Sequence, residues 1–272
     1  MKMKKILLGA ILISATATLA ACGKSSDSAK NQVDTIKKNG TLTVALSADY
    51  PPFEFQTIQN GKNTVVGSDV DLANAIGKKL GVKVKISNMD FSNVLSSVSS
   101  GKADLAISGI TYTKERAKTY NFSKIYYHSP NSIIIKKSDL NKYTNLDSFA
   151  NKQVAAQKGS MQEQIVLKDM KKSNDISLAT IGDEVNEVKT GKVEGAVVET
   201  LIAQSYVDAN PDLALAKVEM PELASDYGMS VAMPKDSSEL TKAVNEVITE
   251  MLQDGTMDKN IQKNYELAKT VK

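Results

Sequence analysis

The sequence has very few of the side chains on which most enzyme and metal sites depend. Its 272 residues contain one cysteine, Cys22, one histidine, His128, and no tryptophan. A single cysteine cannot form an internal disulfide, and one residue of each type cannot supply the Cys and His spacings of a zinc site. His128 stands in "YYHSP" with no G-x-S-x-G motif nearby. Glycine motifs for phosphates or dinucleotides are also absent. We therefore expect no metal, no cofactor and no catalytic residue, although catalysis by carboxylates stays possible.

Arginine is also scarce, and this bears on the class of ligand. Arg116 is the only arginine among the 34 Lys and Arg residues of the chain. The net charge of +3 is accounted for by Lys2, Lys4 and Lys5 at the N-terminus. The rest of the chain is about neutral and has no basic patch of the kind that binds nucleic acid.

The N-terminus has the features of a secretory signal peptide. The three lysines precede an apolar or small stretch, 6–17, which is too short for a comfortable membrane span. "LAAC" at 19–22 resembles the lipobox of bacterial lipoproteins. We expect residues 1–21 to be removed and Cys22 to carry a lipid that holds the protein on the outer face of the cell membrane. The alternative is a stray free or buried thiol. The Ser-rich remainder of 22–34 is expected to be a flexible tether.

Alternating strand and helix patterns predict a two-lobed α/β fold. Residues 40–108 give a β-α-β-α-β order, which implies a parallel sheet with helices on its faces. The pattern restarts beyond Pro130. We expect 35–128 plus 229–272 to form the first lobe and 129–228 the second, each with a mostly parallel sheet. With no long linker the lobes should pack closely, and a ligand belongs in the cleft between them.

A polar segment, "SGITYTKER" at 108–116, follows a predicted strand. Gly109 permits close backbone approach, Thr111 offers a hydroxyl, and Thr113 is expected to cap a helix that contains Arg116. Together with Ser108, this cluster suits a carboxylate, because the planar arginine fork can bond both carboxylate oxygens at once. Arg116 could instead be a solvated surface residue. However, a chain that otherwise uses lysine does not need arginine merely for surface charge.

Six motifs, taken in their order along the chain, support a family resemblance. They are "DYPPFEF", "VVGSDVDLANAIGKKLG", "GKADLAISGITYTKERAKTYNFSKIYY", "AAQKGSMQEQ", "GKVEGAVVE" and "EMLQDGTMDKNIQKNY". Over about residues 36–268 the chain resembles the extracytoplasmic amino-acid-binding lipoproteins of bacterial ABC importers, in bacterial solute-binding protein family 3. The resemblance implies a Venus-flytrap fold of the periplasmic-binding-protein type, with the ligand in the inter-lobe cleft.

The resemblance also implies an amino-acid clamp. Arg116 and the residues before it match the positions that meet the α-carboxylate, and Glu199 matches the second-lobe acid that meets the α-ammonium. Tyr50 matches an aromatic wall with Phe53 packed behind it, although a core role is the rival for Tyr50. The full expected ligand-binding set is Tyr50, Ser108, Gly109, Thr111, Arg116, Gln157, Ser160, Gln162 and Glu199.

The nature of the ligand side chain stays open. Many family members carry an aromatic at the position of Ser68, so we expect that a second stacking wall is missing and that Ser47, Phe53 and Ser68 shape a more open pocket. An arginine or lysine side chain would need acceptors near Ser47, Asp49, Glu54 or Asp90, whereas glutamine would need donors and acceptors.

The predicted function is capture of a free polar L-amino acid by a monomer, by cleft closure, followed by delivery to an ABC permease and its ATPase. One rival is an enzyme on the same fold, a small-carboxylate dehydratase, for which Glu199 is the only candidate acid or base. The other is a sensory or adhesive lipoprotein.

Overall fold

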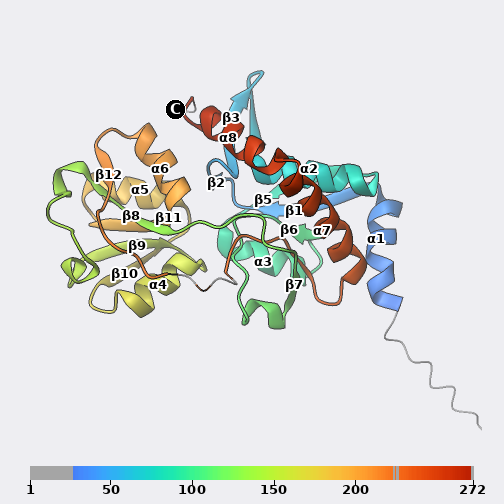
Figure 1. Ribbon diagram of the computed structural model, residues 1–272, viewed down its shortest axis with the longest axis horizontal. Coiled ribbons are helices and arrows are strands. Elements are labelled where there is room, and N and C mark those ends of the chain that lie inside the picture. Colours follow the sequence, from blue (N-terminus) through green and yellow to red (C-terminus); the bar gives the residue numbers. More distant parts are fainter. Residues whose placement is uncertain (1–26, 223, 225–226, 271–272) are drawn as a thin grey trace, which may run out of the picture.

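The structure is a computed structural model that describes residues 27–222, 224 and 227–270. The predicted signal peptide, the lipobox and Cys22 lie outside the described residues. The described chain forms two α/β lobes that lie side by side (Figure 1). Each lobe is built on its own sheet, as predicted.

The first lobe contains both ends of the described chain (Figure 1). Its main sheet has the strand order β5 (Lys83–Asn88), β1 (Thr41–Leu46), β6 (Leu105–Ala106), β13 (Ala232–Pro234) and β7 (Tyr120–Phe122). A smaller sheet joins β2 (Asp49–Tyr50), β3 (Glu54–Gln59) and β4 (Lys62–Val66). The helices of this lobe are α1 (Asp27–Asn39), α2 (Ser68–Leu80), α3 (Phe91–Ser99), α7 (Ser238–Gln253) and α8 (Thr256–Ala268), with the 3₁₀ turn η1 (Arg116–Lys118).

The second lobe repeats the architecture with one chain segment, 131–215. Its strand order is β10 (Asn174–Leu178), β9 (Gln153–Gln157), β11 (Gly195–Glu199), β8 (Asn131–Lys136) and β12 (Leu213–Leu215). The helices are α4 (Met161–Asp169), α5 (Ile181–Thr190) and α6 (Thr200–Ala209), with 3₁₀ turns η2 (Lys137–Asp139) and η3 (Leu146–Phe149).

The two main sheets are mixed, so the expectation of mostly parallel sheets holds for only part of each one. β1 pairs parallel with β5 and β6, but β13 pairs antiparallel with β6 and β7. In the second lobe β9 pairs parallel with β10 and β11, whereas β8 pairs antiparallel with β11 and β12. The reason is the double crossing between lobes: β8 and β13 each enter a sheet from the other lobe rather than through a helix on its face (Figure 1).

One local expectation also needs correction: the described part of the predicted tether is helical, because α1 begins at Asp27. The two ends of "DYPPFEF" form β2 and the start of β3. Helix α7 ends at Gln253, because Gly255 adopts a left-handed conformation (φ 73°) and separates α7 from α8.

The two cores follow from the apolar faces that the sequence supplies. Leu42, Val44 and Leu46 of β1 are fully buried, and Leu240 and Val244 of α7 are buried in the same core. The second lobe has a further apolar cluster that includes the stacked rings of Tyr143 and Phe149, with centroids 4.4 Å apart.

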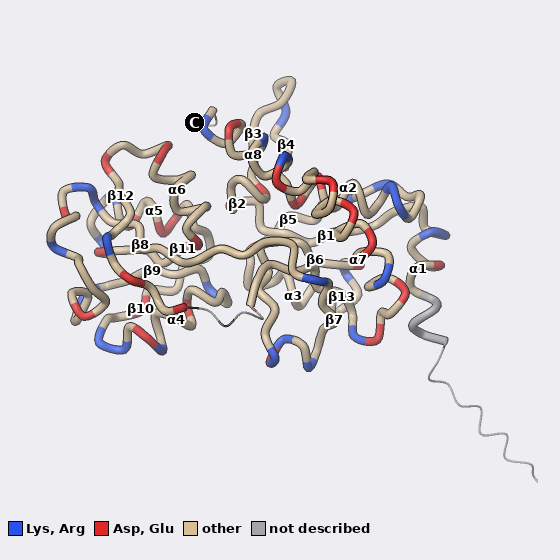
Figure 2. Tube along the Cα trace, viewed as in Figure 1, with Lys and Arg blue, Asp and Glu red and all other residues tan. Residues whose placement is uncertain are grey.

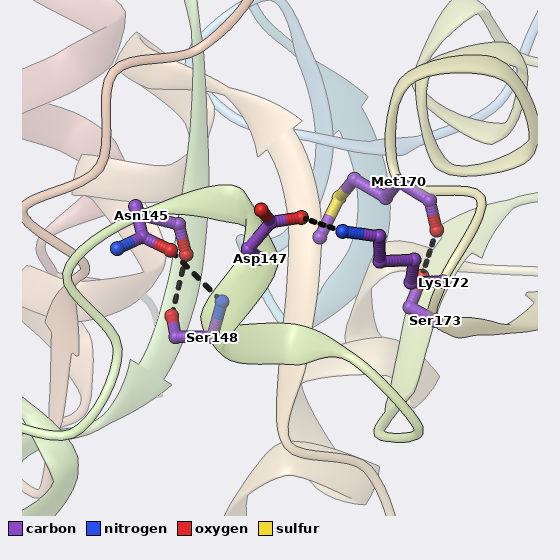
Figure 3. A network of polar contacts seen from close by, with 6 residues as sticks. All are labelled: Asn145, Asp147, Ser148, Met170, Lys172 and Ser173. Atoms are coloured by element: carbon purple, nitrogen blue, oxygen red, sulfur yellow. Dashed lines mark hydrogen bonds and ion pairs between the residues drawn. The ribbon is translucent and has the colours of Figure 1, made fainter.

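Polar contacts secure the surface turn beside this cluster (Figure 3). Asn145 caps η3 by accepting from the Ser148 N–H at 3.0 Å, and Asp147 pairs with Lys172 at 3.0 Å. Charged residues are otherwise spread over both lobes, and lysines do not gather in one patch of the described chain (Figure 2).

Candidate ligand-binding site

An aromatic wall stands at the start of the β2–β3 hairpin. Tyr50 is 8% exposed, and its ring lies 6.2 Å from that of Phe53, which is fully buried and packs on Tyr127 at 5.1 Å. Gly109 lies directly against Tyr50: it has φ 53°, and a Cβ at this position would come within 2.7 Å of the ring. Only glycine fits this contact without movement, so the strand end and the aromatic wall are held together.

A hydrogen-bonded set of carboxyl groups lies behind the strand end. The Ser108 hydroxyl donates to Glu54 Oε1 at 2.8 Å and accepts from the Ser47 N–H at 3.0 Å. Asp69 accepts from the Tyr126 hydroxyl at 2.8 Å. Burial raises the pKa of Asp69 to about 6 and is the main cause that raises the pKa of Glu54 well above its usual value. The nearby Asp69 carboxylate raises the pKa of Glu54 further.

Arg116 follows the strand end and bridges the lobes. Its backbone N–H donates to Thr113 Oγ1 at 3.0 Å, but the expected helix is only the single 3₁₀ turn η1. The guanidinium donates to the Thr111 carbonyl at 2.8 Å and to the Gly159 carbonyl of the second lobe at 3.0 Å. Desolvation lowers its pKa to about 10, so it stays charged at neutral pH. Within the described chain no carboxylate lies at ion-pairing distance from it.

The second lobe faces Arg116 with the start of α4. Ser160 caps this helix by accepting from the Glu163 N–H at 3.0 Å. Gln162, in the first turn, donates to Asn131 Oδ1 at 2.9 Å. Gln157, at the carboxyl end of β9, donates to Asp49 Oδ2 of the first lobe at 2.9 Å. The helix start and two amides thus meet the first-lobe groups across the cleft.

Glu199 ends β11 and is 4% exposed. The polar groups of Tyr50 and Gln162 lie near enough to its carboxylate to favour the ionised form, while Oε2 has no partner among the described residues. Burial is the main cause that raises the pKa of Glu199 to about 8. A cation beside this oxygen would favour the charged carboxylate and reverse the shift.

One inter-lobe cavity gathers most of these groups. The predicted ligand-binding residues other than Glu199 all line it, together with Phe91 and Met161. Its volume is only ≈ 10 Å³, roughly the space of one water. The lobes are therefore closed on one another, and an amino acid can enter only if they part.

Phe91 is an aromatic residue of the cavity lining that the expected set did not include. It is the first residue of α3 and lines the cavity with Tyr50, whereas Ser68 does not line it. Ser68 is buried at the start of α2, where its N–H donates to the Pro52 carbonyl at 3.1 Å. Ser47 and Phe53, which were expected to shape the pocket, do not line the cavity either. Phe91 follows the end of β5 after Met89 and Asp90, at a sheet edge where parallel strands present ligand-binding residues, but its helical apolar pattern did not single it out.

The charges around the cavity are unequal. Arg116 is the only cation among the described residues that line it. Asp49, the Glu54–Asp69 pair and Glu199 surround it with carboxyl groups, and desolvation raises the pKa of each. The described residues contain no group of His, Cys, Asp and Glu that could hold a metal ion. A positive charge placed beside these carboxyl groups would lower their pKa and favour their ionised forms.

The family now follows from comparison with known proteins. The model of the bacterial extracellular solute-binding proteins, family 3, matches residues 42–266. This chain belongs to that family. None of its helices, over the part of the chain that the structure describes, combines the length and apolarity needed to cross a membrane.

Individual relatives cover nearly the whole chain. The arginine-binding extracellular protein ArtP of Bacillus subtilis is 35% identical over 262 residues, 94% of this chain and 96% of the relative. The crystal structure of an amino acid ABC transporter substrate-binding protein, AbpA of Streptococcus pneumoniae, bound to L-arginine, has a TM-score of 0.84 and 43% identity, covering 88% of this chain and 100% of that one. An ancestral amino acid-binding protein, a precursor of cyclohexadienyl dehydratase, is 30% identical with a TM-score of 0.77, covering 86% and 99%.

Proposed function

We propose that this family member is the substrate-binding lipoprotein of an amino acid ABC importer and that its ligand is a cationic L-amino acid, with arginine the first candidate. The observation that carries the proposal is the surplus of carboxyl groups around a cavity whose lining has one cation, Arg116. Arginine as a ligand brings two cations and one anion. It therefore supplies positive charge that would favour the ionised forms of carboxyl groups whose pKa burial has raised.

The α-carboxylate and the α-ammonium of the ligand would each have a complementary partner, one on each lobe. Arg116 donates two of its five guanidinium N–H groups to the carbonyls of Thr111 and Gly159, and the remaining N–H groups can bind the α-carboxylate. The open Oε2 of Glu199 would accept from the α-ammonium. An amino acid would thus be held by opposite charges from opposite lobes.

The ligand side chain would extend between the two aromatic rings that line the cavity. Tyr50 and Phe91 would cover the flat guanidinium or the alkyl stem, since cations are attracted to ring faces. Asp49 and the Glu54–Asp69 pair favour a cation over the neutral amide of glutamine. The relatives whose names include arginine support the same choice.

Capture would proceed without chemistry. The open protein binds the amino acid on one lobe, and closure adds the contacts of the other lobe. A ligand shifts the equilibrium toward the closed form only through contacts made in that form. The closed complex would then dock on a permease and its ATPase, and the lipid on Cys22 would keep it at the outer face of the membrane.

A binding panel tests the ligand. Calorimetry and thermal shift with arginine, lysine, glutamine and glutamate should show the tightest binding for arginine or lysine and the weakest for glutamate. If millimolar concentrations of every amino acid leave the melting temperature unchanged, amino acid capture is refuted. The enzyme alternative rests on the dehydratase precursor among the neighbours. Mass spectrometry of an incubated bound ligand tests it, because only an enzyme would change the ligand mass.

The lipid anchor has a separate test. The full chain and a Cys22→Ser variant are expressed with labelled palmitate in a bacterium. The label should appear in the membrane fraction with the native chain alone. Label on the variant, or no label on either protein, would refute lipidation at Cys22.

A further inference from the structure

One first-lobe residue, Asp49, makes three hydrogen bonds to the second lobe. Asp49 Oδ2 accepts from the Gln157 side chain at 2.9 Å and from the Ile181 N–H at 2.8 Å. Its backbone carbonyl accepts from the Tyr206 hydroxyl at 2.8 Å. Its other carboxylate oxygen accepts from Ser47 of its own lobe at 2.9 Å. Asp49 therefore touches three separate second-lobe elements: the end of β9, the start of α5 and α6.

These contacts fix how the Gln157 amide is turned. Its Nε2 donates to Asp49 Oδ2 and to the Ala179 carbonyl at 3.3 Å. An ionised carboxylate and a carbonyl can only accept, so the nitrogen rather than the oxygen of the amide must face them. Both amide hydrogens are thereby used. Gln157 lines the cavity and is 5% exposed, and the only polar atom it has left for a ligand is Oε1.

We propose that Asp49 is a positioning residue that sets ligand selectivity, because it holds Gln157 with only its carbonyl oxygen available to the ligand side chain. A glutamine side chain that was free to turn could present either its NH₂ group or its carbonyl oxygen to the ligand. Held in this way, it accepts from a guanidinium or ammonium and disfavours a carbonyl or carboxylate at the same place. The inference rests on the proposed function, since it concerns the side chain of the bound amino acid.

The arrangement also links selectivity to closure. Asp49 belongs to the first lobe and Gln157 to the second, so the hydrogen bond between them exists only when the lobes meet. The same oxygen accepts from Ile181, the first residue of α5, where a carboxylate is favoured by the helix dipole. The acceptor for the ligand side chain is thus set in place as the cleft closes.

Two substitutions at one position separate the acceptor role from the charge. Asp49→Asn and Asp49→Ala both remove the negative charge. Asparagine can still accept from Gln157 and Ile181 through its one oxygen while its NH₂ group faces the Ser47 hydroxyl, but alanine cannot. The two probes are arginine and citrulline, which has the same length but carries a neutral ureido carbonyl in place of one guanidinium nitrogen. Calorimetry measures the ratio of their Kd values in each protein.

We expect the preference for arginine over citrulline to be about tenfold smaller in Asp49→Ala than in Asp49→Asn, because a freed Gln157 can turn its NH₂ group to the citrulline carbonyl. Tyr265→Phe is the control for closure alone. It removes a different inter-lobe bond, to Asp208 at 2.8 Å, and should weaken both ligands equally. Equal ratios in the two Asp49 variants overturn the inference while the proposed function stands. If the native protein binds neither probe, the proposed function fails and the inference falls with it.

Discussion

Replacing Arg116 with lysine keeps the positive charge at the strand end but removes the planar fork. In the structure the guanidinium holds the Thr111 carbonyl at 2.8 Å and the Gly159 carbonyl at 3.0 Å, one on each lobe. A lysine ammonium is a point donor, and it cannot keep both carbonyls and also present two parallel N–H groups to a ligand carboxylate. The variant should therefore fold normally and bind its ligand poorly.

The size of the effect follows from the bonds that are lost. A hydrogen bond that involves a charged group contributes about 1.5–3 kcal/mol. Losing one such bond to the ligand carboxylate, and weakening the inter-lobe bond to Gly159, gives about 2–4 kcal/mol. Since 1.4 kcal/mol is a factor of ten, the Kd for arginine should rise about 30-fold to 1000-fold.

Calorimetry of Arg116→Lys with arginine measures this change, and a thermal melt without ligand checks the fold. Lys118→Arg is the matched control. It makes the reverse exchange in the same 3₁₀ turn, at an exposed side chain that pairs with Glu115, and should leave the Kd unchanged. A Kd for Arg116→Lys within about threefold of the native value would refute the assignment of Arg116 to the carboxylate.

Three further predictions concern the remaining site and the core. Because the pKa of the free Glu199 carboxyl is about 8 and only its ionised form accepts from an ammonium, arginine affinity should rise with pH up to about 8; Glu199→Gln should bind weakly and without this dependence in calorimetry. Phe91→Ala should raise the arginine Kd about five- to thirtyfold through loss of one aromatic face, with little change for the fold. Burial raises the pKa of Glu184, whose oxygens have no partner among the described residues, so its charge destabilises the fold above the usual glutamate pKa. Glu184→Gln should be more stable by about 1–3 kcal/mol at mildly alkaline pH, and this gain, followed by thermal melts, should vanish toward acidic pH.

Much of the site could be predicted because its residues sit at strand ends. Ser108, Arg116, Gln157 and Glu199 each follow or end a strand whose apolar pattern is easy to recognise. Carboxyl ends of strands converge on the cleft in this type of fold. Once the strands were identified, the family motifs indicated the order of the residues, and the structure brings Ser108, Arg116 and Gln157 to one cavity.

What could not be predicted depends on packing between distant segments. Phe91 has a helical apolar pattern around it, and nothing local distinguishes a ring that faces the cavity from one that faces the core. Ser68 was given a role through comparison with an aromatic position, but the structure buries it behind the wall. The antiparallel strands β8 and β13 arise from crossings between lobes, which leave no mark on the periodicity of either strand.

On the proposed function, the geometry of the closed lobes explains the single arginine. A cation at this place would satisfy a carbonyl on each lobe and still offer donors to the ligand carboxylate, and only the five N–H groups of a guanidinium can do all three. The buried carboxyl groups around it have the opposite difficulty, because burial raises the pKa of each one. A ligand with a carboxylate and two cations relieves both conditions at once. Closing the lobes without it leaves Arg116 without a carboxylate and Glu199 with an unpartnered oxygen, so the free energy of closure should itself favour cationic amino acids.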